Sequence, residues 1–287
     1  MHKVWIEVAL NGAWNRKLQP LLPDTVEAIV AEGIACARAG ASIIHTHAFE
    51  DGTHTFDWQV YARIIEGIRA QVDVPVYPSY PAIPATGMTP AERFAHVEAL
   101  VERGLLEFAV VDPGSVNFTT AITTAEARPA FTYLNPEAHV RHALDFAKQQ
   151  DLHPAFAIYE PGFTRAGAAL AAAAGVKMPV YRFMFSEKFA FGFPPKPYAL
   201  AAHLELLKEA APGAPWMIAS LAADVRPLIG ETVARGGHVR VGLEDAPLGT
   251  PIGNLAWVED AVRLVRAAGG EPATAADVRR ELAAAPV

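Results

Sequence analysis

Residues 41–71 read ASIIHTHAFEDGTHTFDWQVYARIIEGIRAQ, a short apolar run followed by a longer segment with helical spacing. The run Ser42–His47 predicts a buried strand, and Trp58–Gln71 predicts an amphipathic helix. The same unit recurs along the chain, beginning with a strand at Val4–Leu10 and a helix that starts at Asp24. Repetition of strand and helix is typical of a parallel sheet, because each helix returns the chain to the next strand.

Eight such units are expected. The six further strands are predicted at Val74–Tyr80, Leu106–Val111, Ala155–Tyr159, Val180–Phe185, Trp216–Leu221 and His238–Leu243. The six further helices are predicted at Pro90–Arg103, Pro136–Gln150, Arg165–Ala174, Tyr198–Ala211, Arg226–Arg235 and Leu255–Ala268. Eight units in a chain of this length favour a TIM (β/α)8 barrel over an open doubly wound sheet. A nucleotide-binding open sheet would also have a Gly-rich turn after its first strand, where this chain has N-G-A-W-N-R.

We therefore predict an α/β protein in which residues 1–287 form a single (β/α)8 barrel domain. No linker or break in composition interrupts the chain, which is why a single domain is expected. The tail after Gly269 is expected to form a short C-terminal helical extension. With 52% apolar and 19% charged residues, the chain of 287 residues is neither disordered nor fibrous.

The charge and cysteine content restrict the possible partners and the compartment. A net charge of −7 argues against nucleic acid or an anionic membrane as the main partner. Cys36 is the lone cysteine, which excludes an intrachain disulfide and a cysteine-rich zinc site. Glu7 interrupts the first apolar stretch too early for a secretory signal, and Ala166–Val176 is too short to span a bilayer. We expect a cytoplasmic protein.

Two histidines end the second predicted strand. In His45-Thr46-His47, strand alternation puts both imidazoles on one face, about 6–7 Å apart. Two histidines at this spacing can share one metal ion at about 2.1 Å from each nitrogen. The alternative is a pair of interior histidines that bond backbone or water, but the position at a strand end favours a metal site.

The last predicted strand offers a third ligand. Glu244 and Asp245 are adjacent at its end, and Arg240 lies four residues before the first of them. One carboxylate can face the barrel axis while the other points along the rim, where Arg240 can neutralise one of them. Alone, such a pair is more often a helix cap or a solvated loop. Opposite a His-x-His, two nitrogens and one carboxylate indicate a catalytic zinc site with an open position.

Neutral polar groups follow two other strands. Ser79 follows the third strand, and Ser115 and Asn117 lie in the G-S-V-N-F segment after the fourth. These side chains can hold a carboxylate or carbonyl oxygen of a substrate, although an ordinary turn is an equally good interpretation. They are candidate substrate-binding residues.

Together these motifs resemble the β-keto acid cleavage enzymes, whose founding activity is 3-keto-5-aminohexanoate cleavage. The resemblance covers most of the chain: A-G-A precedes the His-x-His, Ser79 follows the third strand, and G-S-x-N-F follows the fourth. Its most specific part is G-G-H-V-R-V-G-L-E-D at 236–245, beyond which lie Asn254 and the segment 273–279.

The resemblance implies a Zn²⁺-dependent exchange in which a β-keto acid and acetyl-CoA give acetoacetate and a new acyl-CoA. The Zn²⁺ ligands that it implies are His45, His47 and Glu244. In that scheme the metal polarises the carbonyls, and Asp245, tuned by Arg240, is the base that starts the reaction. Ser79 and Ser115 would bond the substrate, although the family more often has threonine at the second position. Family members are commonly homo-oligomers.

The chain departs from the family pattern at three charged positions. After the first strand the family usually has T-G-A-E, whose glutamate partners the catalytic aspartate, but this chain ends that motif with Trp14. Phe49 stands where an arginine is usual, and the fifth strand, 154–160, lacks the usual acidic residues. Glu7 sits early on its strand, so we do not expect it to replace the missing partner of Asp245.

These departures predict a more apolar pocket and a substrate that lacks an amino group. Trp14 and Phe49 are expected to pack against an aliphatic or aromatic tail. The aromatic segment Lys188–Lys196 is interpreted as a lid or an adenine-contacting loop, with subunit packing as an equal alternative.

Two other functions are compatible with part of this pattern. An amidohydrolase-like zinc hydrolase also uses a His-x-His in a barrel, but on the first strand and with further histidines on the fifth and sixth. His153 and His238 instead start their strands here, at the opposite end of the barrel. The second alternative is a barrel that binds metal and keto acid without turnover, and Asp245 beside Glu244 argues against it.

Overall fold

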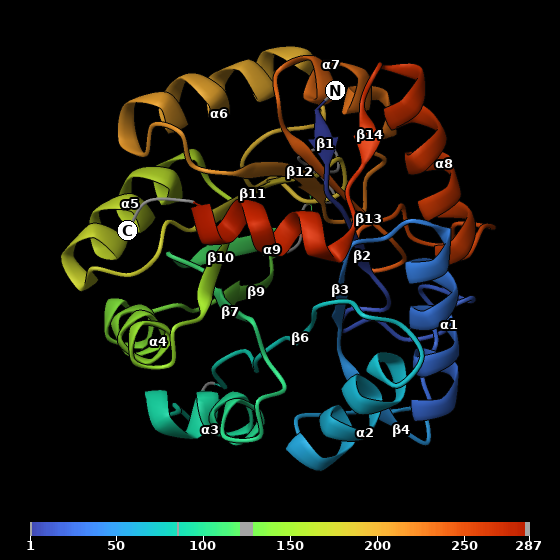
Figure 1. Cartoon of the computed structure of the whole chain (residues 1–287). Coiled ribbons are helices and arrows are strands. Elements are labelled where there is room, and N and C mark those ends of the chain that lie inside the picture. Colours follow the sequence, from blue (N-terminus) through green and yellow to red (C-terminus); the bar gives the residue numbers. More distant parts are fainter. Residues whose placement is uncertain (1, 85, 121–128, 285–287) are drawn as a thin grey trace.

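The computed structural model describes residues 2–84, 86–120 and 129–284, so the predicted domain limits at residues 1 and 287 lie outside the described residues. Eight parallel strands form an almost closed barrel in the order β6-β3-β2-β13-β12-β11-β10-β7 (Figure 1). The strands are β2 (Ile6–Ala9), β3 (Ile43–Thr46), β6 (Val76–Pro78), β7 (Phe108–Val111), β10 (His153–Ile158), β11 (Val180–Phe185), β12 (Trp216–Ser220) and β13 (His238–Val241). Since β6 and β7 at the two ends of this order are in contact, the predicted TIM barrel is confirmed.

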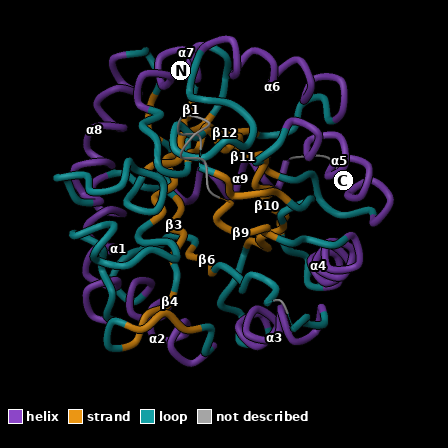
Figure 2. The backbone as a smooth tube through the Cα atoms, turned by 180° about the vertical axis from the view of Figure 1, so that it is seen from behind, coloured by secondary structure: helices purple, strands orange, loops and turns teal. Residues whose placement is uncertain are grey.

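The helices surround this barrel (Figure 2). They are α1 (Val26–Ala39), α2 (Trp58–Arg69), α3 (Pro90–Val101), α4 (Glu137–Gln149), α5 (Pro161–Ala174), α6 (Pro197–Ala210), α7 (Ile229–Ala234, after a 3-10 turn at Arg226–Leu228) and α8 (Asn254–Ala267). None of the helices described is both long enough and apolar enough to cross a membrane.

Two predicted helix starts are wrong. Thr25 rather than Asp24 caps α1, because Thr25 has extended backbone angles and its hydroxyl accepts a bond from the Ala28 N–H. Helix α5 begins at Pro161 and not at Arg165, since proline is favoured in the first turn, where its missing N–H is not needed.

Three short strand pairs were not predicted. Two are antiparallel hairpins at the carboxyl end of the barrel, and the third pairs two short strands in parallel. They are β4 (Ala48–Glu50) with β5 (Thr53–Thr55), β8 (Val116–Thr119) with β9 (Pro129–Tyr133), and β1 (Lys3–Val4) with β14 (Glu271–Pro272). β5, for example, reads Thr-His-Thr and lacks the continuous apolar run that predicted the barrel strands. Both hairpins contribute side chains to the cavity described below.

A helix closes the amino end of the barrel. Helix α9 (Ala275–Ala284), the expected C-terminal extension, lies across that end (Figure 1). Its Val278 and Leu282 pack in one apolar cluster with Trp5, whose indole N–H donates to Glu281 at 2.9 Å. We therefore propose that barrel and extension form one domain.

A buried histidine beside this barrel makes stability depend on pH. His203 of α6 stacks on Phe183, with ring centroids 4.5 Å apart, and neither of its ring nitrogens has a hydrogen-bond partner in the part of the chain that the structure describes. Burial lowers the pKa of His203 to about 4. An unfolded histidine titrates near 6.5, so between these values the unfolded state binds a proton that the folded state does not.

The free energy of unfolding is therefore expected to fall as the pH drops from 6.5 to 4. His203 accounts for on the order of 2–3 kcal/mol of this loss. The variant His203→Leu should show a correspondingly flatter dependence, measured by urea unfolding at pH 7 and pH 4.5. The same loss of free energy in both proteins would contradict this assignment.

Candidate active site

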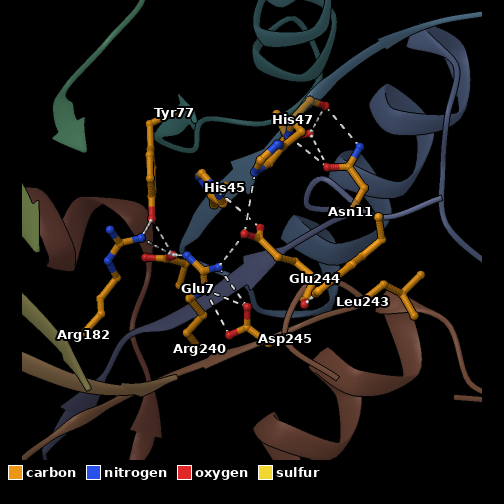
Figure 3. A network of polar contacts seen from close by, with 12 residues as sticks. Glu7, Asn11, His45, His47, Tyr77, Arg182, Arg240, Leu243, Glu244 and Asp245 are labelled. Carbon is orange, nitrogen blue, oxygen red and sulfur yellow. Dashed lines mark hydrogen bonds and ion pairs between the residues drawn. The ribbon is translucent and has the colours of Figure 1, made fainter. Parts of the chain in front are cut away.

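Three side chains at the carboxyl end of the barrel form a candidate metal site. His45 Nε2 lies 3.4 Å from Glu244 Oε2, and His47 Nε2 lies 3.6 Å from Glu244 Oε1 (Figure 3). One donor atom from each residue lies within 4.8 Å of the other two. Two atoms that are each about 2.1 Å from one tetrahedral ion are about 3.4 Å apart. The spacing therefore suits a single ion.

The chemistry of these groups suits a divalent cation. Glu244 Oε2 is buried and has no hydrogen-bond partner among the described residues. Burial alone would raise the pKa of Glu244, but Arg240 and the two imidazoles outweigh it and hold the pKa well below its usual range. Burial lowers the pKa of His45 well below its ordinary value, so its imidazole is neutral. Imidazole nitrogens with an ionised carboxylate are ligands that zinc accepts.

Two contacts with the turn after β2 fix this geometry. Asn11 binds the end of β3 twice: its Oδ1 accepts from the His47 N–H at 2.9 Å, and its Nδ2 donates to the His47 carbonyl at 3.1 Å. Gly12 has a φ of +66°, and a Cβ there would lie 2.6 Å from the Glu244 Cγ. Glycine is therefore required for the carboxylate to reach the histidines.

A third histidine supports the pair. His54 on β5 lies with its Nε2 3.1 Å from His47 Nδ1. Burial lowers the pKa of His54 to about 4, with the charge of His47 adding to the effect, so it bonds as a neutral ring. A bond on the second nitrogen orients a metal-binding imidazole. The sequence did not reveal this residue because the hairpin that carries it was not predicted.

Arg240 connects the acidic groups. Its Nη2 donates to Asp245 at 2.8 Å and its Nε lies 3.0 Å from the same carboxylate, whose other contact is the Ser220 N–H. Arg240 Nη2 also lies 3.3 Å from Glu244. Burial raises the pKa of Asp245 to about 6, and the charge of Glu244 adds to this while Arg240 opposes it. The predicted pairing of Arg240 with Asp245 is present.

Glu7 also belongs to this network. Arg240 Nη1 donates to Glu7 Oε1 at 3.2 Å, so Glu7 contacts the arginine and not Asp245 itself (Figure 3). Tyr77 donates a hydrogen bond to the same Glu7 oxygen, and Arg182 Nη1 donates to the Tyr77 hydroxyl at 2.9 Å. These residues point inward from the middle of their strands, so local sequence patterns do not show that they meet.

A cavity of about 520 Å³ opens above the metal-binding residues. Trp14 and Ser79, both predicted to bind substrate, line it, and the Trp14 indole N–H donates to the Glu244 carbonyl at 2.8 Å. Ser115 and Asn117 are not in its lining. The Ser115 hydroxyl accepts from the Asn135 N–H and the Asn117 amide oxygen accepts from Thr132, each at 2.8 Å. Substrate contacts by these four residues stay predictions.

The lining of the cavity is rich in aromatic residues. Besides Trp14, seven phenylalanine and tyrosine rings contribute to it: Phe56, Tyr80, Phe118, Phe131, Tyr133, Tyr159 and Phe189. Phe189 comes from the segment that we interpreted as a lid. Phe49 is not in the lining, because it is buried beside the ring of His54. Contact of Phe49 with a substrate tail therefore does not follow from its position.

The histidines that distinguish the hydrolase alternative lie away from the site. His238 stacks on Trp5 with ring centroids 4.0 Å apart and faces Glu281 of the helix that closes the amino end. His153 begins β10 at the same end. Neither belongs to the group of metal-binding residues, as the sequence predicted.

Residues 3–283 match the model of the beta-keto acid cleavage enzyme family. The chain belongs to this family. A 3-keto-5-aminohexanoate cleavage enzyme of Fusobacterium nucleatum subsp. nucleatum is 30% identical over 98% of both chains. A 3-oxoadipate:acetyl-CoA acetyltransferase of Cupriavidus necator is 27% identical over 84% of this chain and 79% of its own. The resemblance inferred from the motifs is thus confirmed, and the protein is an enzyme that cleaves β-keto acids.

Solved structures support the fold independently. The apo structure of ObcA superposes with a TM-score of 0.68 at 15% identity and covers 92% of this chain. This chain in turn covers 66% of the ObcA chain. A 3-dehydroquinate dehydratase of Geobacillus kaustophilus covers 92% of both chains with a TM-score of 0.55 at 11% identity. At such low identity these likenesses concern the fold alone.

Removal of one histidine tests the metal site. The variant His47→Ala should purify folded, with its bound zinc reduced from near one to below about 0.1 per chain, because two ligands hold zinc far less tightly than three. Metal content is measured by inductively coupled plasma mass spectrometry and folding by circular dichroism. His142→Ala on α4 is the control and should keep its zinc. Full zinc in His47→Ala would show that the ion binds elsewhere.

Proposed function

We propose that this enzyme transfers the acyl part of a β-keto acid to CoA, giving acetoacetate and a new acyl-CoA from the keto acid and acetyl-CoA. The observation that carries the proposal is a buried carboxylate, Asp245, held by Arg240 directly beside the Glu244 of a three-residue metal cluster. The names of the two relatives, one a β-keto acid cleavage enzyme and one an acetyl-CoA acetyltransferase, support it. The homo-oligomer that the resemblance implies is part of the same proposal.

The proposed cofactor is Zn²⁺ on His45, His47 and Glu244. Bound there, zinc would supply a Lewis acid that withdraws electron density from the carbonyl oxygens of the keto acid. The cavity above these ligands gives the keto acid access, with Ser79 and Trp14 in its wall. We assign Ser79 the role of a donor to the substrate carboxylate.

Asp245 is the proposed base. It takes a proton from C2 of the keto acid, the carbon between ketone and carboxylate, and C2 then attacks the thioester carbon of acetyl-CoA. The CoA thiolate that leaves adds to the original ketone carbon, and cleavage of the C2–C3 bond releases the new acyl-CoA. C2 recovers its proton from Asp245, which completes acetoacetate. A pKa near 6 keeps Asp245 ionised at neutral pH and still basic enough for this exchange.

The geometry places one requirement on this mechanism. Asp245 is 1% exposed and lies behind Arg240, which lines the cavity. Substrate binding must therefore uncover one Asp245 oxygen by a small shift of the guanidinium. Glu7 remains bonded to the other side of Arg240, so the arginine keeps a partner during that shift.

Replacement of the base separates chemistry from metal binding. Asp245→Asn keeps the shape of the side chain but cannot accept the proton, so acetoacetate formation should fall at least about 1000-fold. The readout is mass-spectrometric acetoacetate from acetyl-CoA and a panel of β-keto acids, with zinc content measured on the same samples. Asp145→Asn, at an exposed position of α4, is the control and should keep full activity. Retention of more than a tenth of the activity in Asp245→Asn would exclude Asp245 as the base.

A further inference from the structure

A row of buried polar side chains crosses the interior of the barrel. Four side chains from four different strands, each no more than 3% exposed, form it: Glu7 on β2, Tyr77 on β6, Arg182 on β11 and Arg240 on β13. They point toward one another (Figure 3). Hydrogen bonds connect them into one row that ends at Asp245, the proposed base.

Positive and negative groups alternate along this row. Glu7 Oε1 lies 3.2 Å from Arg240 Nη1 and 3.9 Å from Arg182 Nη1, so two guanidinium groups share one carboxylate. Among the residues that the structure describes, no other carboxylate lies within 4.0 Å of Arg182. Buried like charges repel one another strongly, so the charge of Glu7 is what allows both arginines to lie here.

Tyr77 fixes the direction of the Glu7 carboxylate. An arginine side chain has only donors, so the Tyr77 hydroxyl must accept from Arg182 Nη1, 2.9 Å away. The hydroxyl proton is then left for Glu7 Oε1, the same oxygen that accepts from Arg240. Arg182 also donates through Nη2 to the Ala155 carbonyl at 3.0 Å. The row is thus anchored to the backbone of β10.

Glu7 and Tyr77 differ from the two arginines in their access to the substrate. Arg182 and Arg240 line the cavity, whereas Glu7 and Tyr77 are not among the described residues in its lining. Direct contact with the keto acid does not follow from such positions. What Glu7 and Tyr77 can change is the position of Arg240, which lies in front of Asp245.

The proposed reaction requires Arg240 to uncover one oxygen of Asp245 and then to return. Arg240 holds Asp245 through Nε and Nη2, and it holds Glu7 through Nη1. While the bond to Glu7 persists, the guanidinium can turn about Nη1 and release Asp245 without leaving the site. Without the charge of Glu7, repulsion from Arg182 would press Arg240 toward Asp245 and keep the base covered.

We infer that Glu7 and Tyr77 are positioning residues, which hold Arg240 so that Asp245 can be uncovered without losing its orientation. The inference rests on the proposed function, because Asp245 is the base of the proposed reaction. Neither residue touches the reacting atoms, so their effect belongs to turnover and not to substrate affinity.

Removal of the charge tests this role. In Glu7→Gln, which keeps the size of the side chain and one acceptor oxygen, kcat should fall about 10- to 100-fold, while the KM of each substrate should change less than about threefold. Tyr77→Phe should lower kcat about 3- to 10-fold, again with little change in KM. The substrates are acetyl-CoA and whichever β-keto acid of the panel gives the most acetoacetate. Zinc content and circular dichroism are measured on the same samples.

Tyr181→Phe is the matched control. It removes a buried phenolic hydroxyl one residue from Arg182, but side chains alternate along β11, so Tyr181 points to the opposite face of the strand. Its kcat and KM should equal those of the wild-type enzyme. A rise in KM with loss of zinc in Glu7→Gln and Tyr77→Phe would show a merely structural role and overturn the inference. Full kcat in Glu7→Gln would overturn it as well.

A double variant shows whether Tyr77 acts through Glu7. If it does, Tyr77→Phe should cost less kcat in the Glu7→Gln protein than in the wild-type enzyme, because the charge-assisted bond is already gone. The same fold-loss in both backgrounds would mean that the two residues act independently, which contradicts the inference.

A crystal structure of Glu7→Gln distinguishes the inference from the proposed function. If the wild-type enzyme forms no acetoacetate from any keto acid, the proposed function fails, and the position of Arg240 then decides on the inference. With no negative charge between the arginines, Arg240 Nη1 should lie beyond about 3.5 Å from the side chain at position 7, outside hydrogen-bond distance. An Arg240 that keeps its contacts with position 7 and with Asp245 would overturn the inference.

Discussion

The guanidinium of Arg240 makes the acidic centre of this barrel possible. It bonds Asp245 and Glu7 and lies 3.3 Å from Glu244, so one guanidinium contacts three carboxylates. Three like charges at such distances in a medium of low polarity would repel one another and take up protons. With Arg240 between them, Glu244 stays ionised for metal binding. The same arginine holds Asp245 in one orientation, where burial gives it a pKa near 6.

The fold concentrates these groups at one end. Helix α9 and the Trp5 cluster cover the amino end, whereas the cavity that the metal-binding residues line lies at the carboxyl end. There, Gly12 leaves room for Glu244, and Asn11 locks the end of the strand that carries both histidines. The β8–β9 hairpin adds Phe118 and Tyr133 to the wall opposite β13. The metal-binding residues and Asp112 thus line one cavity.

The sequence predicted the parts of this arrangement that follow from local pattern. The eight strands, the His45–His47 pair and the E-D motif are local features, and the barrel brings them together because all strand ends meet at one rim. Glu7, Tyr77 and Arg182 were missed because only closure of the barrel shows that mid-strand side chains meet on its axis. Asp112 was missed for another reason: an aspartate after a strand is common, and only the folded structure shows that it accepts from the Tyr133 hydroxyl in the cavity wall. Phe49 looked like a pocket residue, but the unpredicted β4–β5 hairpin buries it.

The most direct test of the account follows the carbon atoms. The enzyme is supplied with acetyl-CoA labelled with ¹³C at both acetyl carbons and with an unlabelled β-keto acid. Acyl exchange should give acetoacetate that carries both labels in its C3 and C4 positions, together with an unlabelled new acyl-CoA in equal amount. Labelled acetate with free CoA, or unlabelled products of keto acid hydrolysis, would contradict acyl exchange at this site.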